Sequence, residues 1–315
     1  MLVGTTIRRV TYSIVAFDPD SGQCGVAVQS NWFSVGGLVT FAEPGVGAVA
    51  TQANVEVGYG PRGLALMRGG RSAPEALAEL IQADPLESER QVAMVDVRGV
   101  VVAHTGAACF RHCGQVVGRH HSAQANLMKT GEVWGAMSEA FLGASGTLTD
   151  RLLDALDAGE AAGGDLRGRQ SAAILAVPAS GDAWERVVEV RVEDHPDPLV
   201  ELRRLVAMHR AYAIAREGDA LLGERDMDGA GAKYVEAWEV SPTPVELRFW
   251  ASFGLIHRGE AERGAAMLRE AVESSEGWAT LLALLDDGDA PALAEARRLV
   301  GVQPAGEDGG GAGPT

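Results

Sequence analysis

TYSIVAF, residues 11–17, is the stretch that decides the fold, because β-branched and aromatic residues dominate it and favour an extended strand. The turn cluster DPDSG at 18–22 follows it, and QCGVAVQ at 23–29 has the composition of a return strand. Two such runs on either side of a short Asp-, Pro- and Gly-rich segment predict a β-hairpin. Several of the strands in this region are apolar on both faces, so we expect a sheet that is covered on both sides.

Strands and helices alternate in blocks from this hairpin to about residue 193. A second hairpin is expected from GLVTFAE at 37–43 and VGAVATQ at 46–52, which flank a Pro-Gly turn. Ser72 and Glu75 have the spacing of a capping box at the start of a helix. The remaining expected elements are helices at 60–68, 73–83 and 131–160, a hairpin at 90–104 and strands at 171–193. These blocks predict a layered α/β sandwich rather than a strict βαβ repeat.

The part of the chain after residue 199 has helical periodicity throughout, with an internal repeat. Tyr234–Pro242 matches Leu268–Glu276 at an offset of 34, with Ala237 aligned on Ala271. That offset is the tetratricopeptide period, in which paired helices need small residues where they cross. The alternative is another helical hairpin bundle of similar length. We therefore expect helical repeats over 206–302 and a low-complexity, disordered tail over 303–315.

Composition and charge restrict the partners of the chain. Asp and Glu number 43 against 27 Lys and Arg, which gives a formal net charge of −16 over 315 residues. Such an acidic chain repels phosphate, so we expect no nucleic-acid partner and no membrane partner. Three cysteines give no disulfide framework, and there is neither a membrane-length apolar run nor a convincing signal peptide. We therefore expect a cytoplasmic protein.

Thr11 is the first candidate for chemistry. A threonine at the true N-terminus of a strand can use its own α-amino group, with a pKa near 8, as general base for its hydroxyl. This chemistry requires that residues 1–10 are absent. The alternative is that Thr11 is only a β-forming residue in a strand.

A set of motifs gives Thr11 a context. They are TYSIVAFD at 11–18, GVAVQS at 25–30, GVGAVATQA at 45–53, YGPRGL at 59–64, GGDxRGRQSA at 163–172, and DHPDP with ELRRL within 194–205. Together they resemble the domain-of-unknown-function family number 1028 over about residues 11–205. That family is similar to the N-terminal-nucleophile hydrolases, the αββα superfamily of proteasome β subunits and penicillin acylase. The resemblance implies an α/β (α+β) fold, a four-layer αββα sandwich over 11–205, followed here by an all-α tetratricopeptide-like domain.

The resemblance implies Thr11 as the nucleophile. Members of the family typically begin Met-Thr, whereas Val10 and nine further residues precede Thr11 here. Either residues 1–10 are a leader that is cut autocatalytically, or the start is misassigned and Val10 is a GTG start codon; we favour misassignment. Thr5, in Gly4-Thr5-Thr6, looks like a proteasome-type cleavage junction but does not fit the strand.

Further polar residues complete the candidate site. Ser30 and Asn31 end the second strand of the hairpin and are candidates for orienting the amine or holding substrate. Asn126 is a candidate oxyanion donor through its side-chain amide. A second polar cluster at a strand end consists of Thr51, Gln52 and Asn54. For both strand ends the alternative is an ordinary polar strand terminus.

A Gly-rich loop supplies the last candidates, Asp165, Arg167, Arg169, Gln170 and Ser171. Its arginine pair is suited to clamping a substrate carboxylate. The alternative is a structural ion-pair loop. Proteasome subunits use a lysine near the threonine, but neither Lys129 nor Lys233 lies in the corresponding strands.

One stretch of the sequence suggests a metal site, and the alternative is that its histidines and cysteines are ordinary packing or surface residues. The histidines and cysteines that crowd one stretch are His104, Cys109, His112, Cys113, His120 and His121. Their spacing matches no common structural zinc motif, so we expect neither a metal nor a cofactor. His195 and Asp197 suit a turn and a helix cap better than catalysis.

Two functions follow from these residues. The first is an N-terminal-nucleophile amidohydrolase that acts on a small amide or peptide, and the arginine-bearing loop suits an acidic one. The alternative is a catalytically inactive αββα scaffold that binds a peptide or protein partner through its helical repeats. Both allow a homodimer, which we expect.

Overall fold

The computed structural model describes residues 11–305. Contacts divide the chain into two compact units, Met1–Leu205 and Val206–Thr315. The expected leader, residues 1–10, lies outside the described residues, as does the tail from residue 306.

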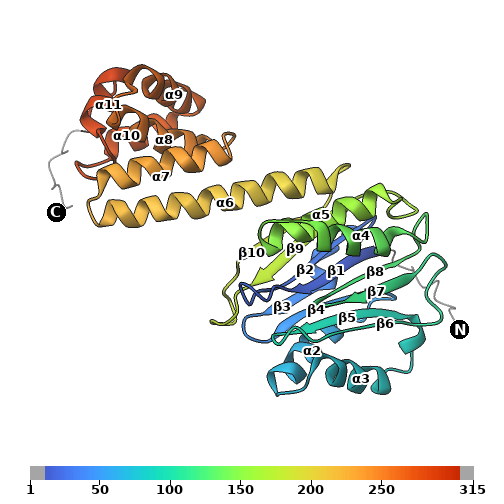
Figure 1. Ribbon diagram of the computed structural model, residues 1–315. Helices are drawn as coiled ribbons and strands as arrows, with labels where there is room; N and C mark the ends of the chain where they lie inside the picture. The colour runs from blue at the N-terminus through green and yellow to red at the C-terminus, as the bar shows by residue number, and fades with distance from the viewer. Residues whose placement is uncertain (1–10, 306–315) are drawn as a thin grey trace, which may run out of the picture. The chain divides into compact units, whose positions relative to one another are not determined.

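The first unit contains two antiparallel sheets (Figure 1). The six-stranded sheet has the order β10-β9-β2-β1-β8-β7, and the four-stranded sheet has the order β3-β4-β5-β6. The strands are β1 (Thr11–Phe17), β2 (Cys24–Ser30), β3 (Thr40–Glu43), β4 (Gly47–Ala53), β5 (Arg90–Asp96), β6 (Val101–Thr105), β7 (Gly114–Gly118), β8 (His121–Asn126), β9 (Ser171–Val177) and β10 (Val188–Val192). β1 therefore lies in the middle of its sheet, between β2 and β8.

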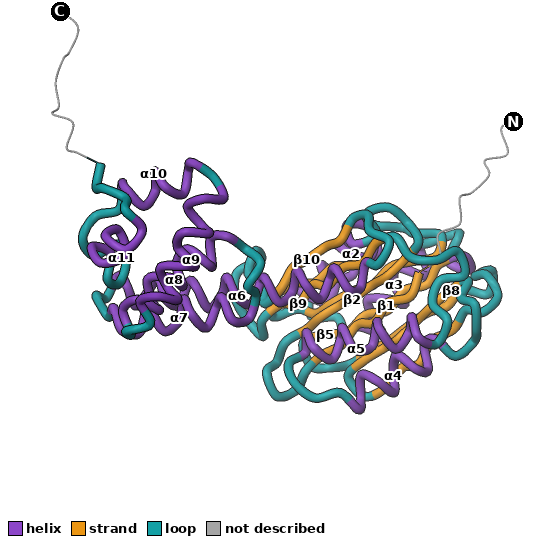
Figure 2. The backbone as a smooth tube through the Cα atoms, turned by 90° about the horizontal axis from the view of Figure 1, so that it is seen from above, coloured by secondary structure: helices purple, strands orange, loops and turns teal. Residues whose placement is uncertain are grey.

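Helices cover the outer faces of both sheets. The helices of this unit are α1 (Gly36–Val39), α2 (Tyr59–Arg68), α3 (Ala73–Ala83), the 3-10 turn η1 (Glu87–Glu89), α4 (Val133–Gly143) and α5 (Leu148–Ala161). α4 and α5 pack on the six-stranded sheet, as Figure 2 shows, and α2 and α3 pack on the four-stranded sheet. The inner faces of the two sheets pack on each other. The expectation of sheets covered on both sides, and of a mixed α/β fold, is confirmed.

Small and β-branched residues fill the space between the sheets. Val15 and Val28 of the six-stranded sheet pack with Ala50 and Ala93 of the four-stranded sheet in one buried cluster. A second cluster joins the outer face of the four-stranded sheet to its helices through Val49, Leu77 and Met94 among others. The central strands β1, β2, β4, β5 and β9 therefore bury both faces, which explains why their apolar residues are nearly continuous.

The predicted strand at 37–43 is wrong in its first half. Gly36–Val39 forms the short helix α1, and only Thr40–Glu43 is extended. A side chain at Gly36 would collide with the Cβ of Ala173, and the Thr40 hydroxyl bonds the Gly36 carbonyl. The chain thus turns tightly against β9 before it enters β3, a long-range contact that local composition does not reveal.

Strands β7 and β8 were not predicted from the sequence, and for β8 the reason is its polar sequence. β8 reads HSAQAN, yet every residue in it is buried. A polar strand gives no hydrophobic period, so it resembles a loop. The capping box of Ser72 and Glu75 is confirmed at the start of α3.

The second unit is entirely helical in its described part. Its helices are the second half of α6 (Pro198–Gly223), α7 (Met227–Val240), α8 (Val245–His257), α9 (Ala261–Ser274), α10 (Glu276–Leu284) and α11 (Leu293–Val300). Adding 34 to the bounds of α7 gives the bounds of α9. The bounds of α8 correspond in the same way to residues 211–223 of α6. The 34-residue offset found in the sequence therefore also relates the bounds of α7 to those of α9, and residues 211–223 to α8.

Two glycines allow α7 and α8 to approach each other closely. A Cβ added at Gly254 would collide with the backbone carbonyl of Gly231. Over residues 11–305, no helix is both long enough and apolar enough to cross a membrane.

Candidate active site

Thr11 begins the central strand β1. It pairs in register with Asn126 of β8, and its Oγ1 donates a hydrogen bond to Ser30 Oγ of β2 over 3.2 Å. Only 1% of Thr11 is exposed. In the 315-residue chain its nitrogen is part of the peptide bond to Val10 and is not a free amine. The structure thus brings together the three residues predicted to be catalytic.

Two side-chain amides converge on the carbonyl oxygen of Thr11. Gln52 Nε2 donates to it over 3.1 Å and Asn126 Nδ2 over 3.4 Å. Gln52 comes from the four-stranded sheet and Asn126 from the six-stranded sheet, so both sheets position Thr11. Gln52 was predicted from its place at a strand end.

Gln91 on β5 joins these two amides and was missed by sequence reasoning. Its Oε1 accepts hydrogen bonds from Gln52 Nε2 at 2.7 Å and from Asn126 Nδ2 at 3.0 Å. Its Nε2 donates to the Thr105 hydroxyl at 2.9 Å and to the Ala125 carbonyl at 3.0 Å. Gln91 is fully buried. The sequence feature that could have identified Gln91 is an uncharged polar residue directly before the apolar run VAMV of strand RQVAMVD.

The amide network continues between the sheets. Ser13 Oγ donates to Gln52 Oε1 at 2.6 Å and accepts from Gln124 Nε2 at 2.6 Å. All of these side chains are buried and hydrogen-bonded to one another, as buried polar groups must be to avoid a large desolvation cost. The inner faces of the sheets are therefore polar at the Thr11 end and apolar farther along.

The predicted oxyanion role of Asn126 meets a geometric obstacle. Both N–H groups of its amide are engaged, one by Gln91 and one by the Thr11 carbonyl. In this arrangement the amide has no N–H left for a developing oxyanion. Its Oδ1 accepts no hydrogen bond from the residues that the structure describes.

Asp165 is the anchor of the Gly-rich loop. It is 1% exposed and accepts hydrogen bonds from the backbone N–H groups of Asn31 and Arg167, each at 2.8 Å. The Arg167 guanidinium also bonds Asp165, at 3.0 Å. Asn31 Nδ2 donates to the Arg167 carbonyl at 3.3 Å. Asp165 therefore fixes the loop directly after Ser30.

The other residues of the Gly-rich loop also form ion pairs and hydrogen bonds with residues outside the loop. Arg169 pairs with Asp197 at 2.7 Å and with Glu160 at 3.6 Å. Gln170 Nε2 donates to Asp194 at 3.1 Å. The arginine pair expected to clamp a substrate carboxylate is thus engaged by carboxylates of the chain, which agrees with the alternative, a structural ion-pair loop.

Three other predicted residues have local partners. The Ser171 hydroxyl bonds the Trp32 carbonyl and the Val35 N–H. The Thr51 hydroxyl donates to the Glu56 carbonyl at 3.2 Å, and Asn54 Nδ2 donates to Glu89 Oε2 at 2.9 Å. These contacts hold the loops after β2 and β4 in place.

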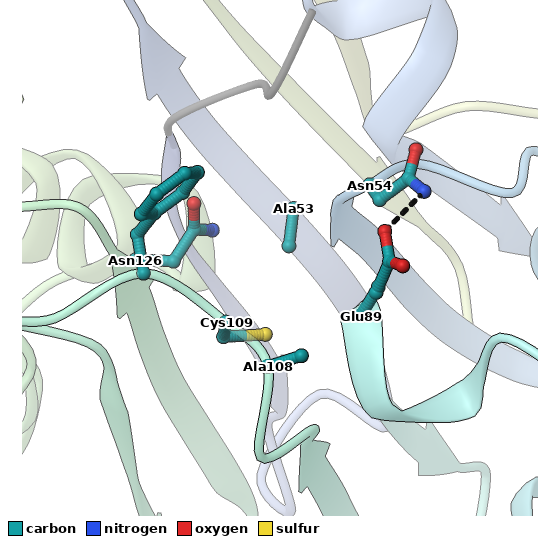
Figure 3. Close-up of a pocket in the computed structure, with 7 residues that line it drawn as sticks. Ala53, Asn54, Glu89, Ala108, Cys109 and Asn126 are labelled. Carbon is teal, nitrogen blue, oxygen red and sulfur yellow. Dashed lines mark hydrogen bonds between the residues drawn. The ribbon is translucent and has the colours of Figure 1, made fainter. Parts of the chain in front are cut away.

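A small pocket opens beside Asn126 (Figure 3). Its volume is about 20 Å³. The residues around it include Ala53, Asn54, Glu89, Cys109, Phe110 and Asn126. Burial is the main cause that raises the pKa of the Cys109 thiol to about 11, and the nearby Cys113 and Glu89 add to it. Cys109 is therefore a neutral thiol at neutral pH, not an activated nucleophile.

Backbone strain lies on both sides of this pocket. Ala53 has a φ of 69° at the end of β4, and Leu127 has a φ of 52° directly after Asn126. Residues other than glycine rarely adopt these values, and such strain concentrates at functional sites.

The histidines and cysteines weighed as metal ligands are dispersed. His121 bonds Ser138, and His120 bonds the Gly99 carbonyl. Across the described residues, no group of three or more His, Cys, Asp or Glu side chains is placed to hold a metal ion. His195 accepts the Asp197 N–H through Nδ1 at 3.0 Å, a local turn contact.

Residues 11–202 match the model of a family described as "Family of unknown function (DUF1028)". No curated protein matches the chain.

Two solved structures are similar to this chain. The crystal structure of protein SPO2555 from Silicibacter pomeroyi, to which the same family model applies, is 32% identical with a TM-score of 0.58, covering 62% of this chain and 88% of that one. Anbu (ancestral beta-subunit) from Yersinia bercovieri is 12% identical with a TM-score of 0.32, covering 65% of this chain and 96% of that one.

Proposed function

The chain belongs to the family of unknown function DUF1028 over residues 11–202, and on this premise we propose that it is an N-terminal-nucleophile amidohydrolase in which Thr11 is the nucleophile. The observation that carries the proposal is the position of Thr11. It begins the central strand, its hydroxyl bonds Ser30, and amides from both sheets hold its carbonyl. A strand residue with only a structural role does not need this set of converging polar groups.

The order of layers supports the same proposal. α4 and α5, the six-stranded sheet, the four-stranded sheet, and α2 with α3 follow one another. We propose that this is the αββα sandwich of the N-terminal-nucleophile hydrolases. The C-terminal helices, with their 34-residue offset, are then a tetratricopeptide-like extension.

The reaction proceeds through an ester on Thr11 once its amine is free. The α-amino group takes the hydroxyl proton, and Oγ1 adds to the carbonyl carbon of the substrate amide. The C–N bond then breaks, and the leaving amine receives the proton. Water cleaves the ester and releases a carboxylic acid, so that the sum is one amide and one water giving one acid and one amine.

The amine has to act as base without help from a lysine. Lys129 is exposed, and Lys233 pairs with Glu217 and Glu236. Ser30, as acceptor of the Thr11 hydroxyl, orients the nucleophile. Gln52 and Asn126 hold the Thr11 carbonyl.

The test is covalent labelling of a chain that begins at Thr11. An acylating β-lactone should add one mass increment in the native protein and none in Thr11→Ala, whereas Thr11→Ser should retain labelling. Thr280→Ala, which removes an exposed helix hydroxyl, is the matched control. A folded chain with a free Thr11 amine that takes up no label would refute the proposal. Intact mass of the natively expressed protein shows whether residues 1–10 are removed.

The second candidate is an inactive scaffold that binds a partner through the helical repeats. Two observations favour it: Thr11 is 1% exposed in the full chain, and the adjacent pocket has a volume of only about 20 Å³. A native chain that retains residues 1–10 would support this candidate, because Thr11 would then have no free amine.

A further inference from the structure

The pocket beside Asn126 presents hydrogen-bond acceptors. Asn126 Oδ1 and Glu89 Oε1 have no hydrogen-bond partner among the described residues, while both N–H groups of Asn126 are engaged. The Cys109 thiol donates to the Arg90 carbonyl at 3.4 Å and is therefore occupied as a donor. Both oxygens can therefore accept hydrogen bonds from a group that enters this pocket.

The pocket also has a negative charge. Glu89 is the one charged side chain among its described lining residues. Arg90, next to Glu89 in the sequence, is paired with Asp84 at 2.8 Å and bonds the Asn54 carbonyl. The arginines of the Gly-rich loop are engaged by Asp165, Glu160 and Asp197. No cation lies among the described lining residues to neutralise Glu89 or to receive an anionic ligand.

The size of the pocket limits the group that fits. A volume of about 20 Å³ holds one group the size of a water molecule. Ala53 and Phe110 are among its lining residues, and this volume leaves no room for a branched head group. A primary ammonium has the required size, charge and donors, whereas a carboxylate has the wrong charge and a quaternary ammonium is too large.

We propose that the substrate of Thr11 is an amide that carries a primary ammonium group, which binds in this pocket between Glu89 and Asn126. This inference rests on the proposed function and names its substrate class. It replaces the expectation of an acidic substrate, because the arginines on which that expectation depended are already paired.

The first arm of the test measures binding without catalysis. In the Thr11→Ala chain, butylammonium chloride should shift the side-chain amide signals of Asn126 and Asn54 in NMR spectra, whereas sodium butyrate and tetramethylammonium chloride should not. Glu89→Gln should weaken butylammonium binding about tenfold or more, because a hydrogen bond to a charged group is lost. Glu89→Asp keeps the charge and should retain the preference for the cation. Glu87→Gln, in the same turn η1 but outside the pocket, is the matched control.

The second arm measures turnover by the chain that begins at Thr11. Glycyl, β-alanyl and γ-aminobutyryl p-nitroanilides place the ammonium at increasing distance from the amide, and their N-acetyl counterparts lack the charge. At least one free amine should react faster than its acetylated counterpart, and Glu89→Gln should abolish that difference.

The outcomes separate the two proposals. If butylammonium binds no better than butyrate, or if Glu89→Gln has no effect on its binding, the ammonium site is refuted even when Thr11 is labelled. If Thr11 is neither labelled nor active but butylammonium binds through Glu89, the amidohydrolase proposal is refuted, and the substrate role of the pocket with it.

Discussion

Gln91 shows how one buried side chain sets the position of two others. Its Oε1 accepts from both Gln52 and Asn126, and these amides hold the carbonyl of Thr11. Thr11, Ser30 and Gln52 could be found from the sequence because each lies at or near the end of a predicted strand. Gln91 could not, because Gln52 and Asn126 are 39 and 35 residues away and only the packing of the sheets brings the three amides together.

Replacing Gln91 by Ala should reduce the free energy of unfolding by about 3 kcal/mol, because buried amides lose their partners and a cavity remains. Urea unfolding measures this loss. Gln82→Ala, on the exposed face of α3, is the control and should change the free energy by less than about 0.5 kcal/mol. Equal effects of the two substitutions would show that the hydrogen bonds of Gln91 do not contribute to the free energy of unfolding.

His121 should make stability depend on pH. It is fully buried, and desolvation lowers its pKa below the ordinary 6.5, although a hydrogen bond from His121 Nδ1 to the Arg119 carbonyl opposes the shift. Below pH 6.5 the unfolded chain therefore binds more protons at this histidine than the folded chain does. The free energy of unfolding should rise with pH up to about 6.5, by at most about 1.4 kcal/mol per pH unit, and then level off.

His121→Gln should remove this part of the pH dependence, measured by urea unfolding between pH 5 and 8. His112→Gln replaces an exposed loop histidine and should leave the slope unchanged. If the slope survives in His121→Gln, the proton uptake belongs to another group.

Among the elements, strands with apolar residues on both faces could be predicted and polar ones could not. TYSIVAF and the strand over 46–52 are extended as expected, whereas HSAQAN is a buried strand whose polar side chains pair across the sheets. For the Gly-rich loop, the observed ion pairs agree with the alternative of a structural ion-pair loop. Its arginines were expected to face a substrate because nothing in the local sequence shows that Glu160 and Asp197 come to lie beside Arg169.

The crossing of α7 and α8 depends on Gly254. Gly254→Ala should reduce stability by about 1–3 kcal/mol, because its Cβ would collide with the Gly231 carbonyl and force the helices apart. Gly277→Ala, in α10, should instead be neutral or stabilise by up to about 1 kcal/mol, because its Cβ meets only the Ser275 hydroxyl at 3.7 Å and Ala is the better helix former. Thermal unfolding of both variants measures the contrast, and a destabilised Gly277→Ala would contradict it.

At the scale of the whole molecule, the chain has two units with separate cores. Gly254→Ala should therefore increase hydrogen exchange in residues 206–305 and leave the strands of residues 11–193 protected. Gln91→Ala should have the opposite distribution. Exchange measured by mass spectrometry resolves both patterns. A rise in exchange in both units after either substitution would show that they unfold as one cooperative body.

The offset of 34 between helix bounds has a consequence for the evolution of the chain. Recombination between the two copies of the repeat can add or delete one complete helical pair without changing the length or the sequence of the helices on either side. Because each pair in such an array contacts mainly its neighbours, an added pair finds a surface that already fits it. The exposed surface of the second unit can therefore grow or shrink by whole helical pairs while the strands around Thr11 keep their sequence.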